Sequence, residues 1–228
     1  MQPPRQRLTG SEREIAILEG AADIFAEEGF KVGTRRLASR LGVTPALLYR
    51  YFESKDDLIL SVFTHAFAEH WDDSWTAILQ QRKRPLEGRI AEFYTAYVLA
   101  RDRRYIRLFL RGCLDGYRAA TRYGTPLDER VLKPVLTQMR RKLQLPSLIE
   151  RPMTRTEREL VLAMHGQMFY MMMRSHAFGL PVPSDLPELI ALQVRATLPG
   201  LLDELAALHA KDGPADPISL DRTLMSTA

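Results

Sequence analysis

Several features that would point to a cellular location or a covalent scaffold are scarce in this chain. Its 228 residues include one cysteine, Cys113, so no internal disulfide can form, and we expect a reducing cytoplasm as its location. The sequence has no run of 18 apolar residues, and its first residues lack the apolar stretch of a secretory signal. We therefore predict a protein without a membrane partner.

The short motifs of common enzyme active sites are also missing. The sequence has no G-x-x-x-x-G-K-[ST] loop, no G-x-S-x-G elbow, no H-E-x-x-H helix and no C-x-x-C pair. His65, His70 and Asp73 are close in sequence, but their steps of five and three residues do not share one helix face. We predict no catalytic residue, no metal site and no cofactor.

The overall charge does not distinguish a nucleic-acid-binding protein, but the local charge does. The net charge is only +4, and residues 1–57 contain nine basic and nine acidic side chains, which cancel. Residues 31–55, in contrast, contain six basic side chains and one acidic side chain, Glu53, a net charge of +5. The basic residues are Lys31, Arg35, Arg36, Arg40, Arg50 and Lys55. This density is sufficient for contacts with nucleic-acid phosphates.

The segment from Thr34 to Lys55 contains two short helical patterns joined by a tight turn. Gly42 separates them, because a residue without a Cβ atom can end a helix in the left-handed conformation. Thr44 is a good N-cap for the second helix, and Pro45 suits its first turn. The apolar residues that hold the helices together are Leu37, Ala38, Leu41, Val43, Leu48 and Phe52. This spacing predicts a helix-turn-helix unit, with a plain helical hairpin as the alternative.

The segment from Ile17 to Phe63 resembles the N-terminal domain of the TetR family of transcriptional regulators. The resemblance is carried by Ala21-Ala22, Phe25, Glu28-Gly29-Phe30, Thr34, Leu37-Ala38, Gly42-Val43, Leu48-Tyr49-Arg50-Tyr51-Phe52, Ser54-Lys55 and Leu58. Beyond Phe63 it rests on the helical layout alone. In the family the position of Thr34 caps the first helix of the motif, and the second helix reads the DNA.

The resemblance implies which residues contact double-stranded DNA. The expected set is Thr34, Arg35, Thr44, Pro45, Ala46, Leu47, Tyr49, Arg50, Tyr51 and Lys55. Pro45, Ala46, Leu47 and Arg50 are expected near base edges, and the hydroxyl groups and Lys55 near phosphates. We select Arg50 for base reading, because an arginine fork matches the O6 and N7 atoms of guanine. A phosphate contact is the alternative for Arg50, and simple packing is the alternative for Tyr49 and Tyr51.

Helical spacing continues after the motif, so the predicted fold is all-α with about nine helices. We expect residues 1–10 to form a flexible basic arm, 11–57 a three-helix DNA-binding domain, 58–210 a helical effector-binding and dimerisation domain, and 211–228 a disordered tail. The expected helices span about 11–29, 34–41, 45–52, 54–81, 86–100, 102–117, 126–145, 154–178 and 187–209.

Local signals mark several ends and interruptions of these helices. Capping boxes are predicted at Ser11–Glu14, Ser54–Asp57 and Thr154–Glu157. A kink or break is expected at Pro134, and a kink at Pro199-Gly200. The basic residues at 82–84, 101–107 and 140–142 are predicted to lie on solvated faces, since charged side chains are mostly exposed.

The resemblance also implies a second domain that binds a small molecule and pairs with its copy. The candidate pocket residues are Phe93, Tyr97, Phe109, Cys113, Met164, His165 and Met168, for which plain core packing is the alternative. The candidate dimer-interface residues are Met172, His176, Leu198, Leu201, Leu202 and Leu205, for which a monomer core is the alternative.

These observations predict a dimeric repressor that binds a palindromic operator and is released by a small, largely apolar effector. Two other functions remain open. One is a DNA-binding protein of the same fold without a small-molecule ligand. The other is a helical adaptor whose basic hairpin contacts another acidic surface. We do not expect an enzyme.

Overall fold

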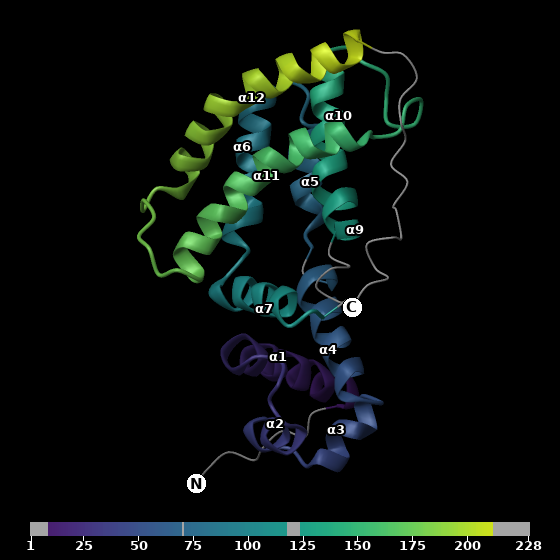
Figure 1. The fold of residues 1–228 in the computed structure, drawn as a ribbon, viewed down its shortest axis with the longest axis vertical. Helices are drawn as coiled ribbons and strands as arrows, with labels where there is room; N and C mark the ends of the chain where they lie inside the picture. Colours follow the sequence, from purple (N-terminus) through teal and green to yellow (C-terminus); the bar gives the residue numbers. More distant parts are fainter. Residues whose placement is uncertain (1–8, 70, 118–123, 212–228) are drawn as a thin grey trace. The chain divides into compact units, whose positions relative to one another are not determined.

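The computed structural model describes residues 9–69, 71–117 and 124–211, and Figure 1 shows their arrangement. These residues form helices and connecting segments without a β-strand, which confirms the predicted all-α fold class. Apart from residues 9, 10 and 211, the predicted arm and tail lie outside the described residues, as does His70. None of the described helices is both long enough and apolar enough to cross a bilayer.

The chain separates into two compact units, each made from more than one stretch of sequence. Of the described residues, those up to 71, those at 101–117 and 176–178, and Gly124 belong to the first unit, and the others from 72 onward belong to the second. The helices of the first unit are α1 (Gly10–Glu28), α2 (Thr34–Arg40), α3 (Pro45–Tyr51), α4 (Lys55–Thr64), the π-helical η1 (His65–Glu69) and α7 (Arg103–Leu114). The helix-turn-helix segment is therefore only part of a larger packed unit.

The second unit contains the remaining helices. They are α5 (Asp73–Gln80), α6 (Leu86–Leu99), α9 (Gly124–Leu127), the π-helical η2 (Asp128–Leu132), α10 (Lys133–Lys142), α11 (Arg155–His176) and α12 (Leu186–Ala210). Helix α6 packs against both α5 and α12, and α10 packs against α5 and α6 (Figure 1). The aromatic side chains of α6 thereby become the centre of this unit's core.

The first helix begins two residues earlier than the predicted capping box requires. Thr9 is the N-cap of α1: its Oγ1 accepts a hydrogen bond from the Glu12 amide at 3.3 Å, and Glu12 Oε2 accepts one from the Thr9 amide at 2.8 Å. The predicted box at Ser11–Glu14 is therefore wrong. Both pairs have the spacing of the motif, but the helix begins at Gly10, so only the Thr9 pair meets the unpaired amides of the first turn.

Helix α7 completes the first unit by closing the C-terminal end of α1. Arg111 donates from Nε to the Ala26 carbonyl at 3.1 Å and from Nη2 to the Glu27 carbonyl at 2.8 Å. These carbonyls belong to the last turn of α1 and have no partner within that helix. The core beneath them includes Phe25 and Phe30, both fully buried. Tertiary contacts from α7 thus fix α1, which in turn supports the helix-turn-helix segment.

Two long helices expected from the sequence are interrupted. The helix expected to run to Gln81 ends as α4 at Thr64, continues through η1, and begins again as α5, where Asp72 Oδ1 accepts from the Ser74 amide at 2.8 Å. Aspartate is favoured at the N-cap of a helix and disfavoured in a helix interior, so a new helix begins after Asp72. The helix expected at 126–145 is divided by η2, and α10 begins at Lys133 with Pro134 in its first turn, where the missing N–H of proline costs no hydrogen bond.

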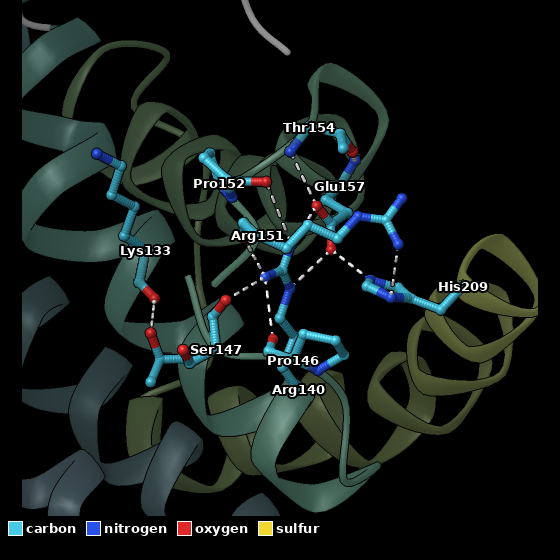
Figure 2. Close-up of polar contacts among 10 residues, drawn as sticks. Lys133, Arg140, Pro146, Ser147, Arg151, Pro152, Thr154, Glu157 and His209 are labelled. Atoms are coloured by element: carbon cyan, nitrogen blue, oxygen red, sulfur yellow. Dashed lines mark hydrogen bonds and ion pairs between the residues drawn. The ribbon is translucent and has the colours of Figure 1, made fainter. Parts of the chain in front are cut away.

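A buried arginine is the clearest departure from the predicted surface. Arg140 is only 1% exposed, so the prediction that residues 140–142 all lie on a solvated face is wrong for this side chain. Its Nε and Nη2 donate to the two carboxylate oxygens of Glu157 at 2.8 and 2.7 Å (Figure 2). Its Nη1 donates to the carbonyl of Arg151 at 2.6 Å. Arg101 is also buried, whereas Arg141 and Lys142 are exposed as expected.

Glu157 connects the buried arginine to the start of α11 and the end of α12. Its Oε2 accepts from the Thr154 amide at 2.8 Å, and the Thr154 hydroxyl accepts from the Glu157 amide at 3.3 Å, which confirms the capping box predicted here. His209 donates from Nε2 to Oε1 at 2.9 Å (Figure 2). Burial raises the pKa of Glu157, but the hydrogen bonds from Arg140, Thr154 and His209 outweigh it and lower the pKa to about 2.

Candidate nucleic-acid interface

The turn between α2 and α3 has the geometry that the sequence predicts. Gly42 adopts a φ of 66°, in the left-handed region that favours glycine. The Val43 amide donates to the Ala38 carbonyl at 3.0 Å, and the Leu41 amide donates to the Leu37 carbonyl at 3.0 Å. This is a Schellman-type helix end, which reverses the chain within a few residues. It fixes where α3 can begin.

Helix α3 begins with the predicted cap and keeps one side in the core. Thr44 Oγ1 accepts from the Leu47 amide at 3.1 Å, and Pro45 occupies the first helical position. Leu48 and Phe52 are almost fully buried. The opposite side of α3 is therefore free to meet a partner.

The predicted DNA-contact residues gather on that open side and on the neighbouring helix ends. Arg35, Thr44, Pro45, Ala46, Tyr49 and Arg50 are exposed, and Thr34, Leu47, Tyr51 and Lys55 are half-buried. The Tyr49 hydroxyl donates to Thr34 Oγ1 at 3.3 Å. Two hydroxyl groups expected at phosphates thus lie together, one on α2 and one on α3.

The resemblance implies that Thr34 caps α2, but in the structure its side chain does not do so. Gly33 is the N-cap residue, it makes no side-chain hydrogen bond, and Thr34 is the first residue of the helix. Because Gly33 has no side chain, the amides of the first turn stay without a side-chain acceptor. Thr34 instead accepts the hydroxyl of Tyr49, which ties α2 to α3.

The predicted base-reading residue lies beside an aromatic ring. Arg50 Nη2 donates to the Tyr51 hydroxyl at 3.3 Å, and its guanidinium carbon lies 5.3 Å from the centroid of the Tyr51 ring. An exposed arginine on a ring is held by a weak cation–π attraction of about 0.5–1 kcal/mol. Contact with a guanine or a phosphate can replace this arrangement at small cost.

Not all of the basic residues counted in the sequence contribute free charge. Arg36 Nε lies 2.8 Å from Glu28 Oε2, and Arg40 pairs with both Glu27 and Glu28. Glu27 and Glu28 belong to α1 and lie outside residues 31–55, over which the net charge of +5 was counted. The count therefore overestimates the positive charge of this surface. In the described part of the chain, the basic residues of this region without an ion pair are Lys31, Arg35, Arg50 and Lys55.

Lys55 lies at the amino end of α4, a helix of ten residues. Ser54 is its N-cap, and Ser54 Oγ accepts from the Asp57 amide at 3.0 Å as predicted. The Asp57 carboxylate turns back to the Glu53 amide at 2.9 Å. The lysine therefore lies on a capped helix end rather than on a frayed segment.

The predicted pocket residues divide between the two units. Phe93, Tyr97 and His165 lie together in the second unit, with the His165 ring 5.5 Å from the Tyr97 ring and the Phe93 and Tyr97 rings 6.4 Å apart. Met164 and Met168 are fully buried in the same unit. The two others belong to the first unit, where Phe109 packs near Phe67 and Cys113 is exposed.

Tyr94 is a candidate that the sequence analysis missed. It is fully buried beside Phe93, with ring centroids 5.2 Å apart, and its hydroxyl has no hydrogen-bond partner in the described structure. Burial, and to a lesser extent Tyr97, raises the pKa of Tyr94, so the hydroxyl stays protonated and can donate. The helical pattern of α6 marks Tyr94 as core, but only the packed structure shows the unused donor.

The predicted dimer-interface residues also differ in their surroundings. Met172, Leu198 and Leu205 are buried within the protomer, which argues against direct contact with a second copy. His176, Leu201 and Leu202 keep partly exposed side chains. The large apolar side chains that α11 and α12 do expose are Tyr170, 55% exposed, and Leu192, 53% exposed.

The described segments contain no cluster of three or more His, Cys, Asp or Glu side chains placed to hold a metal ion. The α2–α3 surface offers hydroxyl groups, guanidinium groups without a carboxylate partner and an exposed helix side. This combination suits contacts with phosphates and base edges of a duplex.

Comparison with known proteins agrees with this geometry. Residues 17–62 match the sequence profile of the family described as bacterial regulatory proteins, tetR family. The matched range contains α2, the turn and α3, together with most of α1 and α4.

Solved structures share the fold at low sequence identity. A TetR-like transcriptional regulator from Rhodococcus sp. RHA1 is 17% identical, with a TM-score of 0.58 over 85% of this chain and 100% of that chain. The fatty acid degradation regulator FadR from Bacillus halodurans is 16% identical, with a TM-score of 0.58 over 85% and 97%. A TetR-family transcriptional regulator from Streptomyces coelicolor is 21% identical, with a TM-score of 0.52 over 85% and 96%. The predicted resemblance is therefore confirmed: residues 17–62 match the tetR-family profile, and most of the chain shares the fold of solved TetR-family transcriptional regulators.

Proposed function

We propose that the protein is a sequence-specific DNA-binding regulator that represses transcription as a homodimer on a palindromic operator and is released by a small, largely apolar effector. The observation that carries this proposal is the division of α3 into a buried side and an open side. Leu48 and Phe52 hold the helix in the core, while Thr44, Tyr49 and Arg50 remain exposed. A helix held in this way can enter the major groove without unfolding its own unit.

Each group on this surface has an expected role. The hydroxyl groups of Thr34 and Tyr49, 3.3 Å apart, suit one phosphate group, and Lys55 suits another. Arg50 is the side chain that we expect to read a base. Since Arg36 and Arg40 already pair with glutamates of α1, they contribute less to phosphate binding than their charge suggests.

The test is fluorescence anisotropy with duplex DNA from the region flanking the protein's own gene, at several salt concentrations. Lys55→Ala should weaken binding to all sequences about equally and reduce the salt slope by about one. Arg50→Ala should relax the preference at one base position and cost about 1–3 kcal/mol there. Arg155→Ala is the control, because Arg155 is exposed on α11 of the second unit.

The outcomes separate the proposal from its alternatives. If the wild type binds this DNA no better than a scrambled duplex, the adaptor function is favoured. If Arg50→Ala retains the wild-type sequence preference, the base-reading assignment is wrong and Arg50 contacts a phosphate. If Arg155→Ala weakens binding as much as Lys55→Ala, the measured affinity is only general electrostatic attraction.

A dimer is proposed because one reading helix covers half of an operator, and two-fold pairing is the commonest way to cover both halves. Exposed Tyr170 on α11 and exposed Leu192 on α12 support this, with the partly exposed Leu201 and Leu202. An interface between two copies would bury such exposed apolar side chains. Met172, Leu198 and Leu205, which were also expected at this interface, are buried within the protomer.

An apolar effector is proposed for the aromatic core of the second unit. The unpartnered hydroxyl of Tyr94 lies among Phe93, Tyr97 and His165, and a buried donor without a partner calls for an explanation. Methionines 164 and 168 can repack around an inserted ligand. Because a protein of the same fold regulates fatty acid degradation, fatty acids are reasonable first probes.

The effector proposal is tested by adding fatty acids of increasing length to the preformed DNA complex. Release of the DNA should occur at one chain length and should weaken about tenfold in Tyr94→Phe, which removes only the hydroxyl. Tyr105→Phe is the matched control, because that tyrosine is half-buried on α7 of the first unit, outside the aromatic core around Tyr94. Failure of every apolar probe to release the DNA would favour a regulator of this fold without a small-molecule ligand.

A further inference from the structure

Two basic segments that are far apart in the sequence line one groove of the second unit. Arg82 and Arg84 lie between α5 and α6, and Arg141 and Lys142 end α10. The groove has a volume of about 500 Å³, and its other lining residues are Pro85, Leu86, Arg89 and Gln138. This volume is in the range of small-molecule sites. The described lining contains five basic side chains and no acidic one.

Arg89 is the unusual member of the groove because it is only 8% exposed. Its Nη1 donates to the Leu79 carbonyl and, at 3.0 Å, to Gln138 Oε1. Its Nε is buried without a hydrogen-bond partner, and no carboxylate of the described residues pairs with it. A buried cation with an unused donor costs free energy unless an anion approaches it.

The surrounding charges increase this cost. Burial lowers the pKa of Arg89, and repulsion from Arg141, Arg82 and Arg84 lowers it further. Of the five cations, only Arg84 has a carboxylate partner among the described residues, Glu92 at 2.5 Å. The negative end of the α10 dipole partly compensates the charges of Arg141 and Lys142, which lie in its last turn. Arg82 and Arg89 do not lie on α10 and have no such compensation from it.

The amino end of α6 adds to the positive character of the groove. Pro85 is the N-cap of this helix of 14 residues and cannot provide a capping side chain, so its first amides have no side-chain acceptor. Pro85 and Leu86 both line the groove, which places this helix end beside the arginines. Unpaired amides and the helix dipole both favour an anion at this position.

We propose that this groove binds a small ligand carrying a di- or triphosphate group. Arginine forks match phosphate oxygens in pairs, and a ligand with several negative charges can meet the four cations that lack a carboxylate partner. Pro85 and Leu86 offer a short apolar surface to the remainder of the ligand. The groove is lined by different residues from the aromatic core around Tyr94, so this site goes beyond the proposed effector and DNA surfaces.

The test is isothermal titration calorimetry of the full chain with inorganic triphosphate at constant ionic strength. We expect saturable binding with one site per protomer. The double variant Arg82→Gln with Arg141→Gln should bind about 100-fold more weakly, about tenfold for each charge-assisted hydrogen bond that the substitutions remove. Both arginine side chains are exposed and make no hydrogen bond or ion pair shown in the structure, so the variant should keep its fold. Arg155→Gln, on the exposed side of α11, is the control and should bind within about twofold of wild type.

Three results would overturn the proposal. The first is that triphosphate binding is not specific to the groove. This follows if binding to the wild type does not saturate, or if Arg155→Gln loses as much triphosphate affinity as the double variant. The second is citrate binding as tightly as triphosphate, because the groove then selects charge and not phosphate. The third is an equal loss of duplex affinity in the double variant, because the groove then belongs to a nucleic-acid surface. None of these measurements depends on Arg50 or Tyr49, so this proposal can fail while the proposed function stands.

Discussion

Replacing Glu157 by glutamine tests how far the buried network of Arg140 holds the second unit together. Glu157 accepts hydrogen bonds from Arg140, Thr154 and His209 and is only 1% exposed (Figure 2). Glutamine has nearly the same shape but no charge, so it leaves the guanidinium of Arg140 buried without its counter-ion. The expected result is a large loss of stability without a change of fold.

The magnitude follows from two independent arguments. Breaking a buried ion pair by removing one partner costs about 3–5 kcal/mol. The pKa of Glu157 is lowered from 4.5 to about 2, and at about 1.36 kcal/mol per pKa unit the difference corresponds to about 3 kcal/mol. We therefore expect Glu157→Gln to reduce the free energy of unfolding by about 3 kcal/mol at neutral pH.

The pH dependence gives the same reasoning a second readout. Because the pKa of Glu157 is lower in the folded protein, its stabilisation is fully present above about pH 4.5 and is lost as the pH falls toward 2. The gap in stability between wild type and Glu157→Gln should therefore narrow on acidification, by about 1 kcal/mol at about pH 3.5. The wild type loses this contribution, and the variant has none to lose.

Urea unfolding followed by circular dichroism, at one protein concentration, measures both effects. Glu159→Gln is the matched control, because Glu159 is exposed, pairs with Arg158 at 3.3 Å and should cost less than about 1 kcal/mol. If Glu157→Gln is as mild as Glu159→Gln, the buried pair does not stabilise the fold. If the gap between wild type and Glu157→Gln stays constant down to about pH 3, the argument from its pKa is refuted.

Three further changes should each give a distinct result. Arg140→Met combined with Glu157→Leu should be less destabilised in urea than either single change, because no unpaired charge remains buried. Thr44→Ala should lower the free energy of unfolding by about 1 kcal/mol through loss of the cap on α3, whereas Thr44→Ser should retain it; equal losses would contradict the capping role. Tyr170→Glu with Leu192→Glu should turn a dimer into a folded monomer in sedimentation velocity, and an unchanged sedimentation coefficient would contradict the proposed interface.

The sequence by itself determined the features that depend on neighbouring residues. The turn at Gly42, the cap at Thr44 and the capping box at Thr154–Glu157 involve groups within a few residues of each other, so their spacing is visible in the chain. The resemblance to TetR-family regulators and the all-α fold class also follow from such spacing. At the start of α1 the sequence analysis selected Ser11–Glu14 and was wrong, because Thr9–Glu12 has the same spacing and forms the capping box.

Tertiary packing decided which charges remain free. Arg36 and Arg40 stay exposed but pair with glutamates of α1, and Arg140 is buried against Glu157. A charge window along the chain cannot include a partner that belongs to another helix. The free energy of a charged side chain depends on all the groups around it, whichever part of the chain they come from.

Only the tertiary structure also revealed the two sites with unused donors. Tyr94 follows the same helical pattern as its neighbours in α6, and its unpartnered hydroxyl depends on how several helices close around it. The basic groove needs the segment before α6, with Arg82 and Arg84, beside the end of α10, with Arg141 and Lys142, although these segments are far apart in the chain. Helical periodicity records which side of a helix is buried, but it does not record which other helix covers that side.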